Sequence, residues 1–345
     1  MERVPLKIGC SAFALLCFGA AAAAPAEDVR FGGTCDGSAG VAVGHDQLLV
    51  ANDEDNALRL YPISGADAPL QVHPLDAFLG VTLDKPEADI EAAAPMDGRV
   101  YWMTSHGRNK KGKARPNRHR FFATEIELTD EGSTVVRPVG KPYARLLDDL
   151  LAPDSHVERT LALSGHRTLP PKRGGINIEG LAATPQGDLW IGLRSPVFAG
   201  EGPSAGTPRA LLVRLRNPAA VVAGEARADL GDAVLIELGG RGVRSLAYRA
   251  STGSILIVAG PPGSHGSFAL YEWGGEGTGA RLLAELESGQ DASPEALVAA
   301  GAPGRILLLV DEGSRPVDGV ECKEAPEGRR SFGGRWLERG DSGGS

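Results

Sequence analysis

Residues 177–193 read NIEGLAATPQGDLWIGL: a short apolar run, a Pro-Gln-Gly turn and a second apolar run. Runs of this length that are rich in Leu, Ile and Ala, joined by a turn containing Gly, predict a tight hairpin of two buried β-strands. The segment begins with the charged Glu179 and continues with the small Gly180. This order of short apolar strand, polar turn and second apolar strand is the pattern that the rest of the chain repeats.

Four other stretches follow the same pattern. Internal repetition of this kind is stronger evidence for the fold than any single motif. In each of the five copies the residue after the first position is small, as expected where inner strands crowd around an axis. These small residues are Gly40, Ala92, Gly180, Ser245 and Ala296. The five hairpins lie at 39–51, 91–104, 179–193, 244–259 and 295–310.

Further strand-like runs follow most of these hairpins. Third strands are predicted at 57–63, 120–128, 210–216 and 268–273, and fourth strands at 70–73, 134–139, 234–238 and 281–285. Four short strands per unit, repeated radially, are typical of a β-propeller. The sequence therefore predicts an all-β protein, built as a β-propeller of about five four-stranded blades.

The spacing of the repeats leaves the blade count open between five and six. The first positions are separated by 52, 88, 65 and 51 residues, and the long interval holds a basic loop at 108–120 and a short helical stretch at 143–152. No further copy of the inner-strand pattern occurs there, so we expect five blades. The last blade lacks a fourth strand, which the run at 29–33 is expected to supply.

The beginning of the chain has the features of a secretory signal peptide. Arg3 and Lys7 precede an apolar run at 8–24, which ends in Ala24-Pro25-Ala26, a small-residue cleavage motif. A transmembrane anchor is the alternative, but the run is short and no basic stop follows it. We expect a signal peptide at 1–26, one propeller domain at 27–339, a disordered tail at 340–345, and a periplasmic or extracellular location.

Cleavage would leave two cysteines, Cys35 and Cys322, one near each end of the mature chain. Exported proteins reside where disulfides form. If the first strand completes the last blade, these two residues come close together. We therefore expect a Cys35–Cys322 disulfide, with two free thiols as the alternative.

The net charge argues against one class of function, and the position of a protease-like motif argues against another. A formal charge of -8 argues against a nucleic-acid protein, which needs basic residues to neutralise phosphates. The string Gly340-Asp341-Ser342-Gly343-Gly344 matches a serine-protease motif, but no chain follows it to build a pocket. The mature protein is expected to be a monomer without a membrane span.

Charged residues are predicted to meet at one mouth of the central channel, because the start of each inner strand and the end of the next lie at the same end of a hairpin. The strand starts contribute Asp89, Glu91, Asn177, Glu179, Arg244 and Glu295, and the strand ends Asp53, Asp55, Ser105, His106, Arg194, Asp311 and Glu312. Such groups must pair with one another, bind an ion or meet a charged ligand. A ring of salt bridges from Arg194 and Arg244 and a ligand site are both open.

The segment 108–120 is strongly basic in an otherwise acidic protein and leaves the same mouth. Arg108 and Lys110 are candidates for an arm that binds anions. A solvated loop is the alternative, and it is the commoner outcome for a run of charge.

Several of these stretches resemble a known bacterial family. Asp89-Ile90-Glu91, the run from Tyr101 to Lys110 and Asn177-Ile178-Glu179-Gly180-Leu181-Ala182 resemble the proteins that carry domain of unknown function 3616. Cys35-Asp36, the run at 53–56 and Gly192-Leu193-Arg194 also fit that family. More distantly, the pattern is similar to the esterase-like phytase propellers and the calcium-dependent lactonase propellers, which implies metal-assisted hydrolysis at the channel mouth.

Two functions from different classes follow. In the first, the protein hydrolyses a small anionic ester or sugar phosphate, with His106, Glu91 and Glu179 as catalytic candidates and Arg108, Lys110, Arg194 and Arg244 binding the anion. Ca²⁺ is the expected cofactor, held by Asp53, Asp55, Glu91, Glu179 and Asp311, because hard cations prefer oxygen ligands. In the second, the propeller is a non-catalytic module that binds a small anionic ligand or an envelope component.

Overall fold

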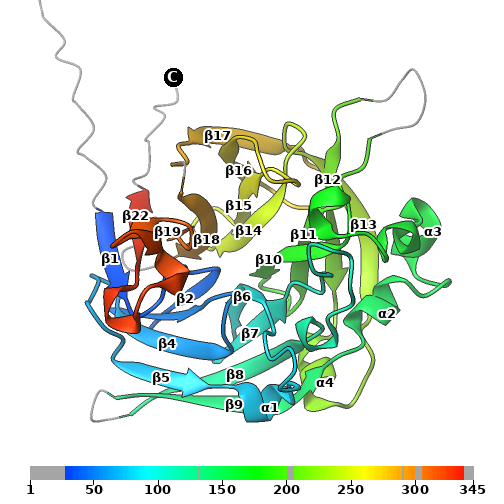
Figure 1. Ribbon diagram of the computed structural model, residues 1–345. Coiled ribbons are helices and arrows are strands. Elements are labelled where there is room, and N and C mark those ends of the chain that lie inside the picture. Colours follow the sequence, from blue (N-terminus) through cyan, green and yellow to red (C-terminus); the bar gives the residue numbers. More distant parts are fainter. Residues whose placement is uncertain (1–27, 130–132, 200–205, 290, 300–304, 338–345) are drawn as a thin grey trace, which may run out of the picture.

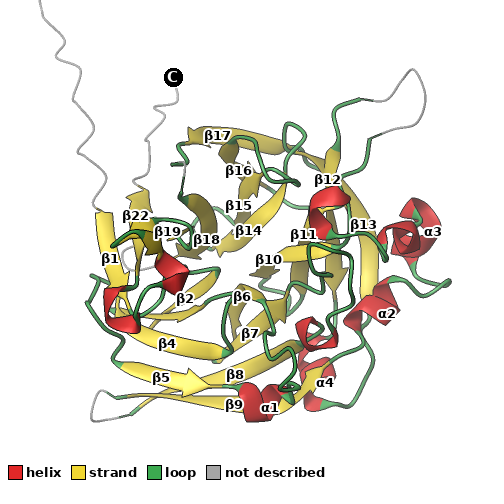
Figure 2. Ribbon diagram, in the orientation of Figure 1, coloured by secondary structure: helices red, strands yellow, loops and turns green. Residues whose placement is uncertain are grey.

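The computed structural model describes residues 28–129, 133–199, 206–289, 291–299 and 305–337. Within them, five four-stranded antiparallel sheets stand around one axis and form a β-propeller (Figures 1 and 2). The predicted fold class and the count of five blades are confirmed. The expected signal peptide at 1–26 and tail at 340–345 lie outside the described residues.

Blades 1 to 4 each use four strands that follow one another in the sequence, from the axis outward. Blade 1 consists of β2 Ala39–Val43, β3 Gln47–Ala51, β4 Ala57–Pro62 and β5 Gln71–Pro74. Blade 2 consists of β6 Ile90–Met96, β7 Arg99–Thr104, β8 Phe121–Leu128 and β9 Thr134–Tyr143. Blade 3 consists of β10 Asn177–Ala183, β11 Leu189–Ser195, β12 Arg209–Leu215 and β13 Leu230–Glu237. Blade 4 consists of β14 Gly242–Arg249, β15 Ser254–Gly260, β16 Phe268–Trp273 and β17 Ala280–Leu286.

Blade 5 closes the ring with strands from both ends of the chain. Its order is β18 Ser293–Ala299, β19 Ile306–Asp311, β22 Ser331–Leu337 and β1 Asp28–Gly32, so the first strand is the outermost. A small hairpin, β20 Pro316–Val317 and β21 Val320–Glu321, precedes β22. The expected closure by the run at 29–33 is confirmed.

A disulfide and a cluster of rings fasten this closure. Cys35 and Cys322 are bonded, with their Cα atoms 5.8 Å apart, which confirms the predicted bridge. Phe31 of β1 stacks on Phe332 of β22 at 5.1 Å, and Tyr61 of blade 1 meets Phe31 edge to face. Since the bonded cysteines are separated by 287 positions, the bridge ties the two ends of the domain together.

The long interval between blades 2 and 3 holds helices rather than a sixth blade. It contains α2 Leu146–Leu150 and α3 His156–Leu161, which lie at the edge of the disk (Figure 1). Two more short helices, α1 Asp76–Leu79 and α4 Pro218–Ala223, pack near the outer strands. None of the helices in the described ranges has the length and apolar surface needed to cross a bilayer.

Apolar side chains fill the spaces between neighbouring blades. One cluster joins Met103 of blade 2 to Ile191 and Val213 of blade 3, all fully buried. The inner strands stay close because their crowded positions carry small residues. At Gly180, a Cβ atom would lie 2.6 Å from Val243 Cγ1 of blade 4, so no larger residue fits there without a shift.

Candidate functional site

A β-bulge re-aims one charged residue in four of the five inner strands. The pairing of inner and second strands shifts register at Glu91, Glu179, Arg244 and Glu295, in blades 2, 3, 4 and 5. A bulge leaves one residue outside the ladder and changes where its side chain points. These four residues occupy the same position in their repeats, immediately before the small residue.

Blade 1 lacks both the charge and the bulge. The equivalent position is Ala39, which pairs with Ala51 in an unbroken register. The ring of charges at this mouth is therefore open on one side, where blade 1 instead contributes Asp53 from the loop after β3. The charged residues expected at the mouth separate into two groups with different chemistry.

The first group is a buried ion-pair network across blades 3, 4 and 5. Arg244 Nη1 lies 3.0 Å from Glu179 Oε2, and Arg244 Nη2 contacts Glu295 Oε1. All three side chains are buried. Burial and the neighbouring Arg194 lower the pKa of Arg244, while the glutamates act in the opposite direction. The salt-bridge ring is thus present on this side of the mouth.

Arg194 extends the network and has its bonds directed inward. Its Nη1 donates to Glu179 Oε1 at 3.0 Å, its Nε to the Pro261 carbonyl at 3.1 Å and its Nη2 to the Gly263 carbonyl at 2.8 Å. Asn177 Nδ2 also donates to Glu179. Glu179 Oε1 consequently accepts from two donors, and all three Arg194 nitrogens have partners. Arg244 Nε and Nη1 make no hydrogen bond among the described residues, although Nη1 forms the ion pair with Glu179.

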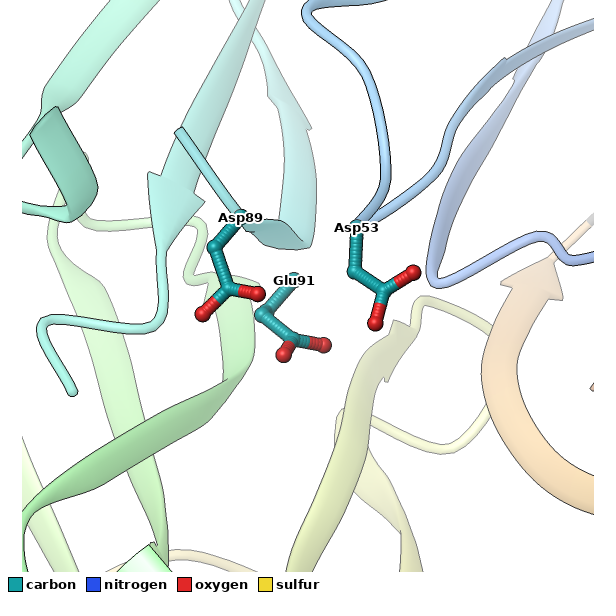
Figure 3. A group of neighbouring side chains, drawn as sticks. All are labelled: Asp53, Asp89 and Glu91. Carbon is teal, nitrogen blue, oxygen red and sulfur yellow. The ribbon is translucent and has the colours of Figure 1, made fainter. Parts of the chain in front are cut away.

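The second group is a set of three carboxylates from blades 1 and 2. One carboxylate oxygen from each of Asp53, Asp89 and Glu91 lies within 4.8 Å of the others. Figure 3 shows the three side chains converging, with Glu91 between the two aspartates. Asp89 is buried, whereas Asp53 and Glu91 are partly exposed. The group is therefore accessible from the mouth.

Asp89 is the most tightly held of the three. Its Oδ2 accepts a hydrogen bond from Ser105 Oγ and lies 2.9 Å from Arg118 Nη1. Asp53 and Glu91 have no arginine or lysine within salt-bridge distance among the described residues. The group thus carries three carboxylates against one guanidinium.

The pKa values of all three carboxyls are raised. Burial raises the pKa of Asp89 to about 7, against the opposing effects of Arg118 and Ser105. Burial also raises the pKa of Asp53, followed by repulsion from Asp89 and Asp311. For Glu91, burial is again the main cause, followed by repulsion from Glu179 and Asp89. These carboxyls are costly to ionise together unless a cation joins them.

Asp36 lies beside this group and adds to its negative charge. It is buried, and its Oδ1 has no hydrogen-bond partner among the described residues. Burial raises its pKa first, and repulsion from Asp53, Asp311 and Glu54 raises it further. An orphaned buried carboxylate oxygen next to other carboxylates indicates a missing proton or cation.

The backbone of blade 2 takes unusual conformations on both sides of this mouth. Asp89 and His106 have positive φ angles of 63° and 54°. Left-handed conformations are uncommon for residues other than glycine and concentrate at functional sites. Both flank Ser105, whose hydroxyl joins Asp89 to the backbone N–H of Gly107 at 3.1 Å.

Asp55, Asp311 and Glu312 lie outside the group of three. Asp55 pairs with Arg59 at 2.6 Å. Glu312 pairs with Arg30 at 2.8 Å and with Arg315 at 3.0 Å. Asp311 Oδ1 accepts a hydrogen bond from the Gly313 N–H at 2.7 Å and remains close enough to raise the pKa of Asp36 and Asp53.

His106, Arg108 and Lys110 belong to a different region. His106 and Arg108 line a separate cavity of about 110 Å³ under the basic segment. Lys110 is exposed on that segment. The structure thus places most of the predicted site residues in the arginine network, the carboxylate group or this cavity, whereas Asp55, Asp311 and Lys110 belong to none of the three.

Two carboxylates of the mouth were not predicted as metal ligands from the sequence. Asp89 was placed on the rim, but its position beside Asp53 depends on the conformation of two loops. Asp36 enters the sequence analysis only as part of Cys35-Asp36 in the family resemblance, without a role at the mouth. Their nearness in the sequence to Glu91 and Cys35 could have indicated that Asp89 and Asp36 are metal-ligand candidates, because the fold determines where Glu91 and Cys35 lie.

The opposite mouth is apolar. A cavity of about 340 Å³ lies there between the inner strands of all five blades, lined by residues such as Val41, Leu181, Leu246 and Leu297. The channel therefore has one charged end and one apolar end. Asp97 is the one charged residue among those that line this cavity.

Comparisons with known proteins find one family model that matches part of the chain. Residues 134–284 match the model of a family described as "Protein of unknown function (DUF3616)", which confirms the predicted resemblance for this part of the chain. A comparison with curated proteins finds no match.

Solved structures that resemble the chain are similar to it only distantly. They include a virginiamycin B lyase from Staphylococcus aureus, with 11% identity, coverage of 90% of this chain and 99% of that one, and a TM-score of 0.37. A streptogramin B lyase shows 9% identity, coverage of 90% and 97%, and a TM-score of 0.35. The WD40 repeats of RRP9 show 10% identity, coverage of 87% and 94%, and a TM-score of 0.36. Similarity at this level says nothing about the site.

Proposed function

We propose that this propeller, whose residues 134–284 carry the DUF3616 domain, binds Ca²⁺ at its charged mouth and uses it to hydrolyse a small anionic ester or sugar phosphate. The observation that supports the cation is the convergence of Asp53, Asp89 and Glu91 within 4.8 Å. Ca²⁺ takes carboxylate and carbonyl oxygens in flexible geometry. Side chains from two blades with raised pKa values fit that requirement.

The two groups at the mouth would have different tasks. Asp53, Asp89 and Glu91 would hold the cation, which when bound supplies positive charge to polarise a phosphoryl or carbonyl oxygen. The Arg244 network would hold blades 3 to 5 in register and keep Glu179 out of the cation site. Glu179 is therefore assigned to positioning rather than to the cation.

A carboxyl next to the cation is better placed than His106 to accept a proton. Asp36 has a raised pKa and an oxygen without a partner. His106 Nδ1 is 2.8 Å from the Thr104 carbonyl, and burial lowers its pKa to about 3. In this proposal Asp36, ionised when the cation is bound, would receive the proton of the water whose oxygen attacks the phosphoryl or carbonyl group. The ester bond would break, and its oxygen would leave as the alcohol after taking up a proton. His106 has no part in this step.

The experiment combines metal analysis with a substrate panel. Purified mature protein would be assayed for phosphatase, esterase and lactonase activity with Ca²⁺ and with chelator, alongside Asp53→Asn and Asp55→Asn. A calcium-dependent activity lost in Asp53→Asn and kept in Asp55→Asn supports the proposal. Bound calcium without any activity would favour the second function, a non-catalytic module that binds an anionic ligand or envelope component.

The proposed location is the periplasm or the outside of the cell. The Cys35–Cys322 disulfide supports an oxidising compartment. Amino-terminal sequencing of the exported protein should find a start near Glu27. An intact Met1 on membrane-embedded protein would contradict this assignment.

A further inference from the structure

A small cavity under the basic segment stands apart from the carboxylate group and has the opposite charge. It measures about 110 Å³. Its lining residues are His106, Arg108, Ala114, His119, Leu147, Arg167, Leu169 and Ile176, so two arginines and two histidines stand among apolar side chains. No carboxylate lines it within the described part of the chain.

The basic segment is a folded element rather than a loose run of charge. Asn109 Oδ1 accepts hydrogen bonds from the backbone N–H groups of Lys111 at 3.0 Å and Lys113 at 2.9 Å. Arg108 Nε donates to the Arg167 carbonyl at 2.7 Å and its Nη1 to the Gly112 carbonyl at 2.9 Å. These bonds tie 108–113 to the segment around Arg167, so the walls of the cavity are fixed.

The charge on this surface is largely uncompensated. Among the described residues, the lysines in ion pairs are Lys85 and Lys323, neither of which belongs to the basic segment. Arg167 Nη2 pairs with Asp148 at 3.0 Å and has further N–H groups to donate. Arg108 likewise keeps Nη2 beyond its two carbonyl bonds.

Two stacked histidines line the cavity, and one of them has a buried ring nitrogen without a partner among the described residues. The rings of His106 and His119 stack at 5.5 Å and 10°. Burial and then Arg120 lower the pKa of His119, and Arg167 and Arg108 lower it further, against Asp148. His106 is 2% exposed, and its Nε2 has no hydrogen-bond partner among the described residues. Because Nδ1 of the neutral ring donates to the Thr104 carbonyl, Nε2 is an acceptor, which the P–OH group of a monohydrogen phosphate can satisfy.

We propose that this cavity is a binding site for a phosphate group, held by Arg108 and Arg167 with His119 beside it. The cavity is of the size of a single tetrahedral oxyanion. Guanidinium groups recognise phosphate by charge-assisted hydrogen bonds. Exposed Lys110, Lys111 and Lys113 steer anions toward it. The site is independent of calcium, and it does not rest on the proposed hydrolysis.

Calorimetric titration of the mature protein with inorganic phosphate, in chelator and at low ionic strength, tests the proposal. Wild type should bind at one site, and Arg108→Gln and Arg167→Gln should each weaken binding by about tenfold or more, the effect of one hydrogen bond to a charged group. Lys141→Gln and Lys172→Gln, which remove exposed cations that neither line the cavity nor belong to the basic segment, should change the affinity by about twofold or less. Glucose 6-phosphate, titrated in parallel, distinguishes free phosphate from a phosphate ester as the preferred ligand.

A second measurement keeps the test decisive if an arginine variant loosens the segment. Ala114→Leu reduces the cavity without removing charge and should also weaken binding. The ¹⁵N signals of His106 and His119 should shift with phosphate, while those of exposed His45 should not. Absence of binding to wild type, equal losses in all four charge variants, or a shift of His45 alone would overturn the proposal.

Discussion

The guanidinium of Arg244 lies 3.0 Å from the carboxylate of Glu179, across the boundary between blades 3 and 4. Both residues sit at β-bulges in equivalent positions of their inner strands. The same position holds Glu91 in blade 2, which has no such partner and instead joins Asp53 and Asp89. One structural position therefore serves two purposes around the ring.

This difference predicts opposite consequences for two matched substitutions. Glu179→Gln should lower the free energy of unfolding by roughly 3 kcal/mol with or without calcium, because it leaves buried arginines poorly paired. Glu91→Gln should leave the stability in chelator unchanged or higher, since it removes a buried carboxylate that other carboxylates repel. Thermal melts with calcium and with chelator measure both. Exposed Glu127→Gln is the control, and equal behaviour of the two variants would refute the division of the mouth into two groups.

Calcium stabilisation should depend on pH because of Asp89. Its pKa is raised to about 7 in the folded protein, so the folded state keeps a proton that the unfolded chain loses above about pH 4. The stability of the calcium-free protein should therefore fall as the pH rises through this window, by up to about 1.4 kcal/mol per pH unit for one such group. Calcium must displace that proton, so the rise in Tm on adding calcium should grow from pH 5 to pH 8.

Comparing melts with and without calcium at each pH isolates this effect. Burial lowers the pKa of His106 to about 3, so His106 makes the protein less stable as the pH falls below about 6.5, the ordinary pKa of histidine. That contribution is the same in both melts and cancels in the difference. A calcium-induced shift in Tm that is flat from pH 5 to pH 8 would show that Asp89 does not take part.

The closing disulfide should contribute strongly to stability. Because Cys35 and Cys322 are 287 positions apart, their bond closes a loop of nearly the whole domain. The chain-entropy model gives about 5–6 kcal/mol for such a loop, less any strain. The double variant Cys35→Ser, Cys322→Ser should melt lower than wild type, and the amides of β1 should exchange hydrogen faster. Unchanged exchange in β1 would mean that the strand pairing alone holds the closure.

Gly180 should tolerate no side chain. A Cβ there would lie 2.6 Å from Val243 Cγ1 and 2.8 Å from Leu246 Cγ, so Gly180→Ala should destabilise the protein by about 1–3 kcal/mol through overpacking. Gly279→Ala is the matched control, because a Cβ at Gly279 meets nothing within 4 Å. Denaturant unfolding of the two variants compares them directly, and equal midpoints would contradict the close packing of blades 3 and 4.

The sequence predicted the repeat, the closure of blade 5 and the disulfide because each follows from pattern and topology. The five small residues of the repeat identify the inner strands. The run at 29–33 is assigned to the last blade because that blade lacks a strand. The sequence did not predict strand β22, because SFGGRWL, residues 331–337, follows a long segment between strands instead of a hairpin turn.

The division of the mouth could not be predicted, because it depends on side-chain directions that spacing does not determine. Glu91 and Glu179 occupy the same repeat position, yet their partners come from neighbouring blades and from loops. Asp36 and Asp89 join the carboxylates only because the loops around them fold back to the mouth. Glu179 meets Arg244 of the following blade, whereas Glu91 meets Asp53 of the preceding blade.

The most direct test of the account is a calorimetric titration of chelator-treated mature protein with Ca²⁺ at pH 8. Wild type should bind at one site, Asp53→Asn and Glu91→Gln should weaken binding by about tenfold or more, the effect of losing an anionic ligand, and Asp55→Asn should bind as wild type does. Absence of calcium binding to wild type, or equal loss in Asp55→Asn and Asp53→Asn, would contradict a calcium site formed by Asp53, Asp89 and Glu91.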